Sequence, residues 1–254
     1  MAERFAPHVN DQRAALLGVL NGCTDDDWGL PTPCGSWSVH DVVAHLVENE
    51  LLFGRLYRGE LADFTTDTQA GVDRWAKVDG ETARYSLWHH GQATQRVIDS
   101  RSDESWRRPI ERGGVPLELR HALRLHFFEL AVHGHDVTTA LGHDPVWHDR
   151  AGTVVEYCLR GAPRALERSN APPDGAFVVR APEVGARTID GTSGAWRLVS
   201  EPVADPTATW DADAETLVLA TTGRMAVADA LGRSTVGGDA ARLEAMLAGW
   251  QVTR

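Results

Sequence analysis

The sequence has only three cysteines, Cys23, Cys34 and Cys158, among its 254 residues. Their number is odd, they lie far apart, and no two form a C-x-x-C pair, which disfavours a disulfide framework. We expect each to be a small core side chain rather than a ligand or a nucleophile. Reduced thiols are typical of the cytoplasm, and the first residues lack the basic-then-apolar pattern of a secretory signal peptide. These features predict a cytoplasmic protein.

Positive charge is also scarce. The 25 Lys and Arg residues are outnumbered by 36 Asp and Glu residues, which gives a formal net charge of −11. Nucleic-acid binding needs clustered Lys and Arg, so we expect no nucleic-acid partner. No apolar run reaches the roughly 18 residues that a membrane-spanning helix requires, so we expect no membrane partner either. The apolar share of 43% and the charged share of 24% are those of an ordinary globular protein.

The most informative stretch is a long helical pattern from about residue 116 to residue 141, followed by Gly142 in the usual stop position. Within it, Glu129 and His133 are four residues apart, so their side chains leave the same face of the helix. Apolar residues surround them on most of the circumference, which predicts a buried helix. A buried carboxylate and imidazole are costly unless they are paired, and a metal ion pairs them well. The pattern therefore predicts one half of a metal site.

The other half is expected from a second helix, which begins at Ser38 with Asp41 three residues on, a capping-box-like start. His45 lies in an apolar part of this helix. Together with Glu129 and His133 it would give two imidazoles, one carboxylate and an open position, the pattern of catalytic zinc. Neither a di-iron pattern of paired Glu-x-x-His motifs nor a protease H-E-x-x-H motif is found. Spacing alone leaves equally open a bundle with two satisfied core histidines.

The rest of the pattern predicts an α+β fold in two domains. Helical periodicity at about residues 3–20 and 67–100 completes an antiparallel four-helix bundle over residues 1–169, which also includes a helix at about 149–167. A linker rich in Pro and Gly follows, and residues 174–254 are expected to form a smaller α+β domain. Its expected strands and helices are at residues 176–180, 186–190, 195–199, a fourth strand ending at Trp210, 212–221 and 239–250.

Two motifs carry a family resemblance. The stretches PTPCGSWSVHDVVAHL (residues 31–46) and ELAVHGHD (residues 129–136) together resemble the mycothiol-dependent maleylpyruvate isomerase family, a branch of the DinB-like metal-dependent four-helix bundles. The resemblance covers the chain to about Glu167, and the strand-rich remainder is similar to the smaller C-terminal domain of that family. It implies a divalent ion bound by His45, Glu129 and His133, and zinc is the first candidate. Asp136 is then either an acceptor that orients a ligand or a residue bonded to a nearby group.

The resemblance also implies a low-molecular-weight thiol, mycothiol, as cosubstrate. A thiol at the open metal position would lose its proton and could attack a small electrophile, for cis-trans isomerisation or for S-transfer. Arg224 is similar to a family arginine that reaches the site from the C-terminal domain and could bind a carboxylate, with Arg233 as a competitor for that role. Trp37, just before the His45 helix, could line the cofactor pocket. Two alternatives remain: a hydrolase whose metal activates water, and a non-catalytic metal- or ligand-binding stress protein.

Overall fold

A computed structural model describes residues 6–64, 68–147 and 150–252. The chain forms two compact units, Met1–His148 and Asp149–Arg254. Within the described residues no helix combines the length and the apolarity needed to cross a membrane.

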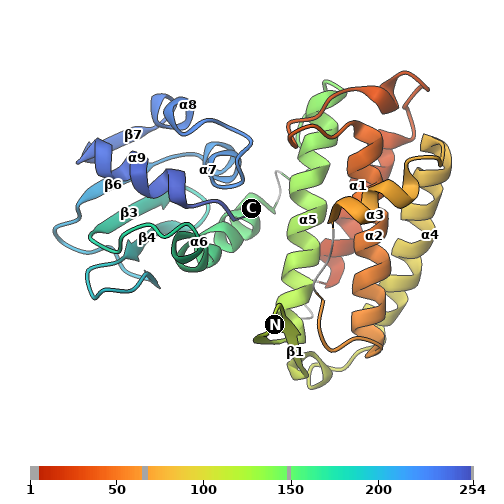
Figure 1. The fold of residues 1–254 in the computed structure, drawn as a ribbon, viewed down its shortest axis with the longest axis horizontal. Coiled ribbons are helices and arrows are strands. Elements are labelled where there is room, and N and C mark those ends of the chain that lie inside the picture. Colours follow the sequence, from red (N-terminus) through yellow and green to blue (C-terminus); the bar gives the residue numbers. More distant parts are fainter. Residues whose placement is uncertain (1–5, 65–67, 148–149, 253–254) are drawn as a thin grey trace. The chain divides into compact units, whose positions relative to one another are not determined.

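The first unit is built on four long helices that lie side by side (Figure 1). They are α1 (Ala6–Leu20), α2 (Val39–Arg58), α4 (Gly80–Asp99) and α5 (Leu119–Ala140). Each packs against two others, because α1 and α2 both contact α4 and α5. The expected four-helix bundle is therefore confirmed, and α5 is buried around most of its circumference as its sequence predicts.

Local signals fix both ends of α2. The Ser38 backbone N–H donates to Asp41 Oδ2 at 2.9 Å, and the Asp41 N–H donates back to Ser38 Oγ at 3.2 Å, which confirms the expected capping box. The helix ends at Gly59, whose φ of 86° lies in the left-handed region that glycine tolerates best. α5 is followed in the same way by Gly142, with a φ of 71°.

Two expectations for the first unit need refinement. The helical pattern at residues 67–100 is two helices, α3 (Thr68–Trp75) and α4, because Asp79 caps α4 by accepting from the Thr82 N–H at 2.8 Å. The central helix begins at Leu119 rather than near residue 116, because β2 (Val115–Glu118) pairs antiparallel with β1 (Pro109–Arg112). Short 3-10 turns lie at η2 (Asp27–Gly29) and η3 (Ser105–Arg107).

The second unit carries a five-stranded sheet with the order β5-β4-β3-β6-β7. Within this sheet the β3–β6 pair is parallel, and the β3–β4, β4–β5 and β6–β7 pairs are antiparallel. Its strands are β3 (Ala176–Ala181), β4 (Gly185–Asp190), β5 (Arg197–Val199), β6 (Ala208–Asp211) and β7 (Thr235–Gly238). Its helices are α6 (Ala151–Arg168), α7 (Ala214–Thr221), α8 (Val227–Gly232) and α9 (Ala240–Gly249). The chain is thus a helical bundle followed by a smaller α+β domain, as expected.

The boundary between the two units lies after His148, earlier in the sequence than the expected linker after residue 169. The reason is α6, an amphipathic helix whose buried face packs against α7, β4 and β5 of the second unit. β7 and α8 were not expected, because both are short and Gly237 and Gly238 in β7 weaken a strand pattern.

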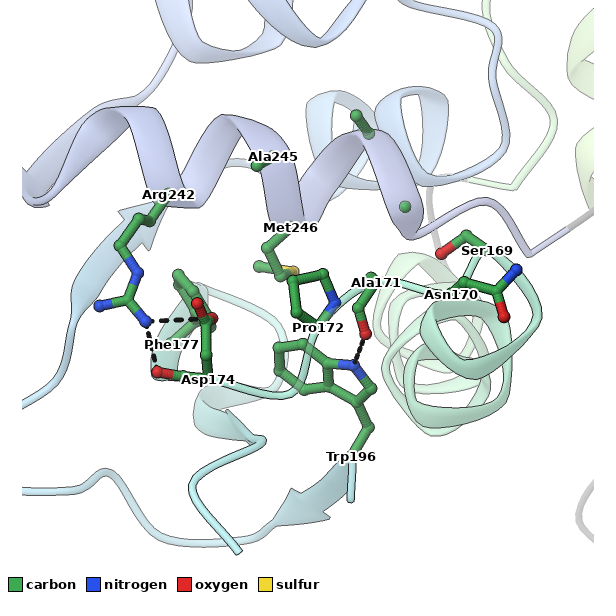
Figure 2. A pocket seen from close by; sticks show the side chains of 12 residues that line it. Ser169, Asn170, Ala171, Pro172, Asp174, Phe177, Trp196, Arg242, Ala245 and Met246 are labelled. Atoms are coloured by element: carbon green, nitrogen blue, oxygen red, sulfur yellow. Dashed lines mark hydrogen bonds and ion pairs between the residues drawn. The ribbon is translucent and has the colours of Figure 1, made fainter. Parts of the chain in front are cut away.

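A cavity of about 410 Å³ lies in the second unit between α9 and the segment from Ser169 to Asp174. Figure 2 shows Trp196 across its floor, with the indole N–H donating to the Ala171 carbonyl at 2.9 Å. Arg242 of α9 closes one end, bonded to Asp174 by an ion pair of 3.0 Å. These contacts hold the segment after α6 against α9.

Candidate metal centre

Two helices of the bundle bring the three expected ligands together. His45 Nε2 on α2 lies 3.2 Å from Glu129 Oε2 on α5, and His133 Nε2 lies 3.4 Å from the same oxygen. The three donor atoms all lie within 4.8 Å of one another. The two histidines are buried, while the Glu129 side chain keeps 19% of its exposure, so the group is open on the carboxylate side.

These distances fit a bound divalent ion. Ligand atoms about 2.0–2.2 Å from a tetrahedral zinc lie roughly 3.3–3.6 Å from one another. The two separations from Glu129 Oε2, 3.2 and 3.4 Å, fall close to that range without rearrangement of the helices. Two imidazoles and one carboxylate are also a donor set that zinc accepts while keeping one position for water or substrate.

Asp136 fixes the orientation of one ligand. Its carboxylate, which is fully buried, accepts from His133 Nδ1 at 2.9 Å. This hydrogen bond turns His133 Nε2 toward Glu129 and sets the tautomer that a metal ligand needs. Of the two interpretations of Asp136 offered by the sequence, the geometry matches the orienting one.

The electrostatics of the group favour positive charge between the three donor atoms. Burial opposes ionisation of Glu129, but hydrogen bonds with His133 and His45 outweigh it and hold the pKa of the carboxyl well below its usual range. Burial also opposes protonation of His133, but the hydrogen bond to Asp136 and those to two further neighbours raise its pKa well above the usual value. A divalent cation at this place would supply the same positive charge.

Sequence reasoning missed Asn49, which lies one turn after His45 on the same face of α2. Its Nδ2 lies 3.0 Å from His45 Nε2 and 3.5 Å from Glu129 Oε2. The lone pairs of both ligands are therefore directed toward one small region that a single donor or cation can occupy. The spacing of four residues from His45 is the signal that could have identified it.

Cys34 also differs from expectation. It is half-buried rather than a core residue, as is Cys23, whereas Cys158 is buried as expected. The Cys34 thiol is hydrogen-bonded with His133, and its sulfur lies within 4.8 Å of donor atoms of His133 and Asp136. A second, alternative set of three possible metal ligands thus shares His133.

Trp37 lies beside the candidate ligands. Its ring centre is 5.1 Å from that of His45 and 6.0 Å from that of His133, while its indole N–H donates to Gln69 Oε1 at 3.3 Å. The indole therefore forms part of the wall around the two imidazoles, which suits the expected role beside a cofactor.

Arg224 belongs to the second unit, in the turn after α7, where it donates to the Thr222 carbonyl at 3.1 Å. Its positive charge acts on the buried Cys158 thiol, whose pKa burial raises to about 12 despite this opposing influence. Arg233, its competitor, follows α8. A role for either arginine at the His45 group remains a prediction.

Comparison with known families gives this geometry a context. The sequence model described as mycothiol maleylpyruvate isomerase N-terminal domain matches residues 9–138, which include all three candidate ligands. That match covers more than half of the chain. The protein belongs to this family.

Two solved structures of the mycothiol-dependent maleylpyruvate isomerase share the fold. A histidine-to-alanine variant of that enzyme superposes with a TM-score of 0.70 at 10% identity and covers 93% of each chain. Another structure of the enzyme gives 0.68 at 11% identity, over 89% of this chain and 90% of that one. At such identities the likeness shows the fold alone, and it extends over both units. No curated protein sequence matches the chain.

Proposed function

We propose that this protein is a divalent-metal-dependent enzyme, with zinc on His45, Glu129 and His133. It uses a low-molecular-weight thiol, mycothiol, to isomerise or to S-modify a small electrophile. The observation that carries the proposal is the convergence of the three donor atoms at 3.2 and 3.4 Å in a chain of this family. Membership gives the chemistry to test, because the solved relatives are named for mycothiol dependence and maleylpyruvate isomerisation.

Zinc would supply a Lewis-acidic position that stabilises the thiolate form of a bound thiol at neutral pH. The residues of the chain hold and orient that position. Asp136 keeps His133 Nε2 directed at the site, whereas the Asn49 amide, now 3.0 Å from His45 Nε2, would have to turn away when zinc takes that lone pair. The partly exposed Glu129 marks the side from which ligands enter.

Two further residues complete the proposal. Trp37, half-buried beside both imidazoles, offers an apolar wall for the body of the thiol cosubstrate. Arg224 of the second unit is proposed to bind a substrate carboxylate, for which a guanidinium is well suited because it donates two parallel hydrogen bonds.

The first test is the metal content of the purified protein by elemental analysis. We expect about one divalent ion per chain in the wild type, lost in His45→Ala and in His133→Ala. His89→Ala, which removes an exposed histidine of α4, is the matched control and should keep the ion. A wild type that takes up no zinc would refute the metal centre.

The second test is turnover of maleylpyruvate and related electrophiles with and without mycothiol, followed by absorbance. Turnover that requires the thiol supports the proposal. Turnover without it would point instead to a metal-activated water, and hence to the hydrolase alternative. Circular dichroism of each variant separates loss of the site from loss of the fold.

A further inference from the structure

A second polar group lies deep in the bundle, outside the candidate metal centre. Arg13 of α1, Glu50 of α2 and His126 of α5 are each about 1% exposed. Glu50 Oε1 accepts from Arg13 Nε at 2.6 Å and lies 3.1 Å from His126 Nε2. We call these three residues the Glu50 cluster. One carboxylate thus links three helices through a single oxygen atom.

The imidazole of His126 is held tightly by α2. It stacks on Phe53 with ring centres 4.5 Å apart, and its Nδ1 lies 3.3 Å from the Tyr57 hydroxyl. Glu50, Phe53 and Tyr57 share one face of α2, at spacings of three and four residues. His126 is therefore a side chain of α5 inserted among three side chains of α2.

This insertion lies close to the metal ligands on the same two helices. Glu50 is five residues beyond His45 on α2, about 7.5 Å of helical rise, and His126 is three residues before Glu129 on α5, about 4.5 Å. His45 contacts Glu129, and Glu50, which is later in α2, contacts His126, which is earlier in α5. The two helices are therefore antiparallel, and both contacts depend on one register. A slide of α5 along α2 would change both contacts together.

We propose that the Glu50–His126 contact sets the register of α2 against α5, and so positions His45 opposite Glu129 and His133. The proposal rests on the proposed function, because it treats those three residues as a metal site. Ligand atoms must be held within about 0.5 Å of their productive places, whereas apolar packing alone can lose a unique arrangement before it loses stability. The buried Glu50–His126 hydrogen bond does not tolerate larger shifts, because a slide of α5 would take His126 Nε2 away from Glu50 and leave a buried polar group without its partner. His126 and Glu50 are positioning residues in this scheme, with no contact to substrate.

The cluster itself offers a matched pair of variants. His126→Phe keeps an aromatic ring against Phe53 and removes the link between α2 and α5. Arg13→Met removes the link between α1 and α2 and leaves Glu50 paired with His126. Both disturb the same buried charge, so both are expected to lower the unfolding free energy. Only the first breaks the contact that the proposal invokes.

The experiment measures the zinc dissociation constant of the full chain by competition with a chromophoric chelator, alongside urea unfolding of each variant. We expect zinc to bind at least about tenfold more weakly in His126→Phe, the scale found when support of metal ligands is lost. Arg13→Met should stay within about threefold of the wild type. His126→Gln, whose amide nitrogen falls near the place of Nε2, should restore most of the affinity.

Unchanged zinc affinity in His126→Phe would overturn the proposal. So would equal weakening in both variants in proportion to their lost stability, since that marks a purely structural cluster. If His126→Phe does not fold, His126→Asn replaces it, because its shorter side chain ends before the position of Nε2. A wild type without zinc affinity would instead refute the metal centre itself, so the two failures are distinguishable.

Discussion

Acid should remove a defined part of the stability of the bundle through Glu50. Burial alone would raise the pKa of this carboxyl, but Arg13 and then His126 outweigh it and lower the pKa to about 2 from 4.5. A carboxyl whose pKa is lower in the folded state stabilises that state above the unfolded pKa. Its contribution is therefore fully present above about pH 5 and is lost as the pH falls from about 4.5 to about 2.

The size of the effect follows from the shift. A difference of about 2.5 units corresponds to about 3 kcal/mol of unfolding free energy over the whole range. The linkage relation places about 1 kcal/mol of that loss above pH 3.5, where the effect can be measured before the chain unfolds. The Glu50 side chain is fully buried, so solvent does not screen its interactions with Arg13 and His126.

The assay is urea unfolding of the wild type between pH 5.5 and pH 3.5, followed by fluorescence. The reference is a triple variant, Arg13→Met, Glu50→Met and His126→Phe, in which apolar side chains replace the cluster and nothing in it titrates. Such replacements are often neutral or stabilising, so the reference should fold. The wild type should lose about 1 kcal/mol relative to it over this interval. A constant difference between the two proteins would show that the pKa of Glu50 is not lowered in the folded state.

Three further predictions test other parts of the structure. Ser38→Ala removes the N-cap of α2 and should cost about 1 kcal/mol in urea unfolding, and no loss would mean that the cap is dispensable. Gly91→Ala places a methyl group against the Arg13 side chain and should destabilise the bundle by about 2 kcal/mol, whereas an unchanged midpoint would show that Arg13 can move aside. In the native protein a thiol reagent should modify the half-buried Cys23 and Cys34 and spare Cys158, which is buried and whose pKa is raised to about 12. Cys158 should react once denaturant is added, and fast reaction of all three thiols in the native protein would contradict this.

The helical part of the fold could be predicted well because its signals are local. The capping box at Ser38, the glycine after α5 and the apolar circumference of α5 each act within a few residues. Local sequence signals fail to predict an element when its ends or its position depend on contacts with another segment of the chain. The start of α5 depends on the hairpin that uses Val115–Glu118, and α6 depends on the sheet against which its apolar face packs. Neither partner can be identified from the helix alone.

The candidate ligands were predictable for a different reason. Glu129 and His133 share a helix face by spacing. His45, 84 residues from Glu129, was added because it lies in an apolar helix, and the family resemblance then favoured this metal site over two core histidines. Asn49 was missed because an amide is seldom a metal ligand, although its spacing of four residues from His45 was visible, and Cys34 was assigned to the core because it has no partner cysteine nearby in sequence. Their importance depends on which ring nitrogen or carboxylate oxygen lies nearby, and that is a property of the packed helices.

The Glu50 cluster shows why such a site cannot be derived from its ligands alone. In sequence, Arg13 and Glu50 resemble solvated helix residues, and His126 resembles one more histidine on an apolar helix. In the folded chain all three are buried, and Glu50 is the partner of both Arg13 and His126. Apolar helix faces specify that α2 and α5 pack, but apolar packing alone can lose a single register before it loses stability, so that neighbouring registers compete. A charged contact that fails when displaced selects among those registers, and it does so about one helical turn from the atoms that would hold a metal. The residues that make the centre accurate are therefore separate from the residues that make its chemistry.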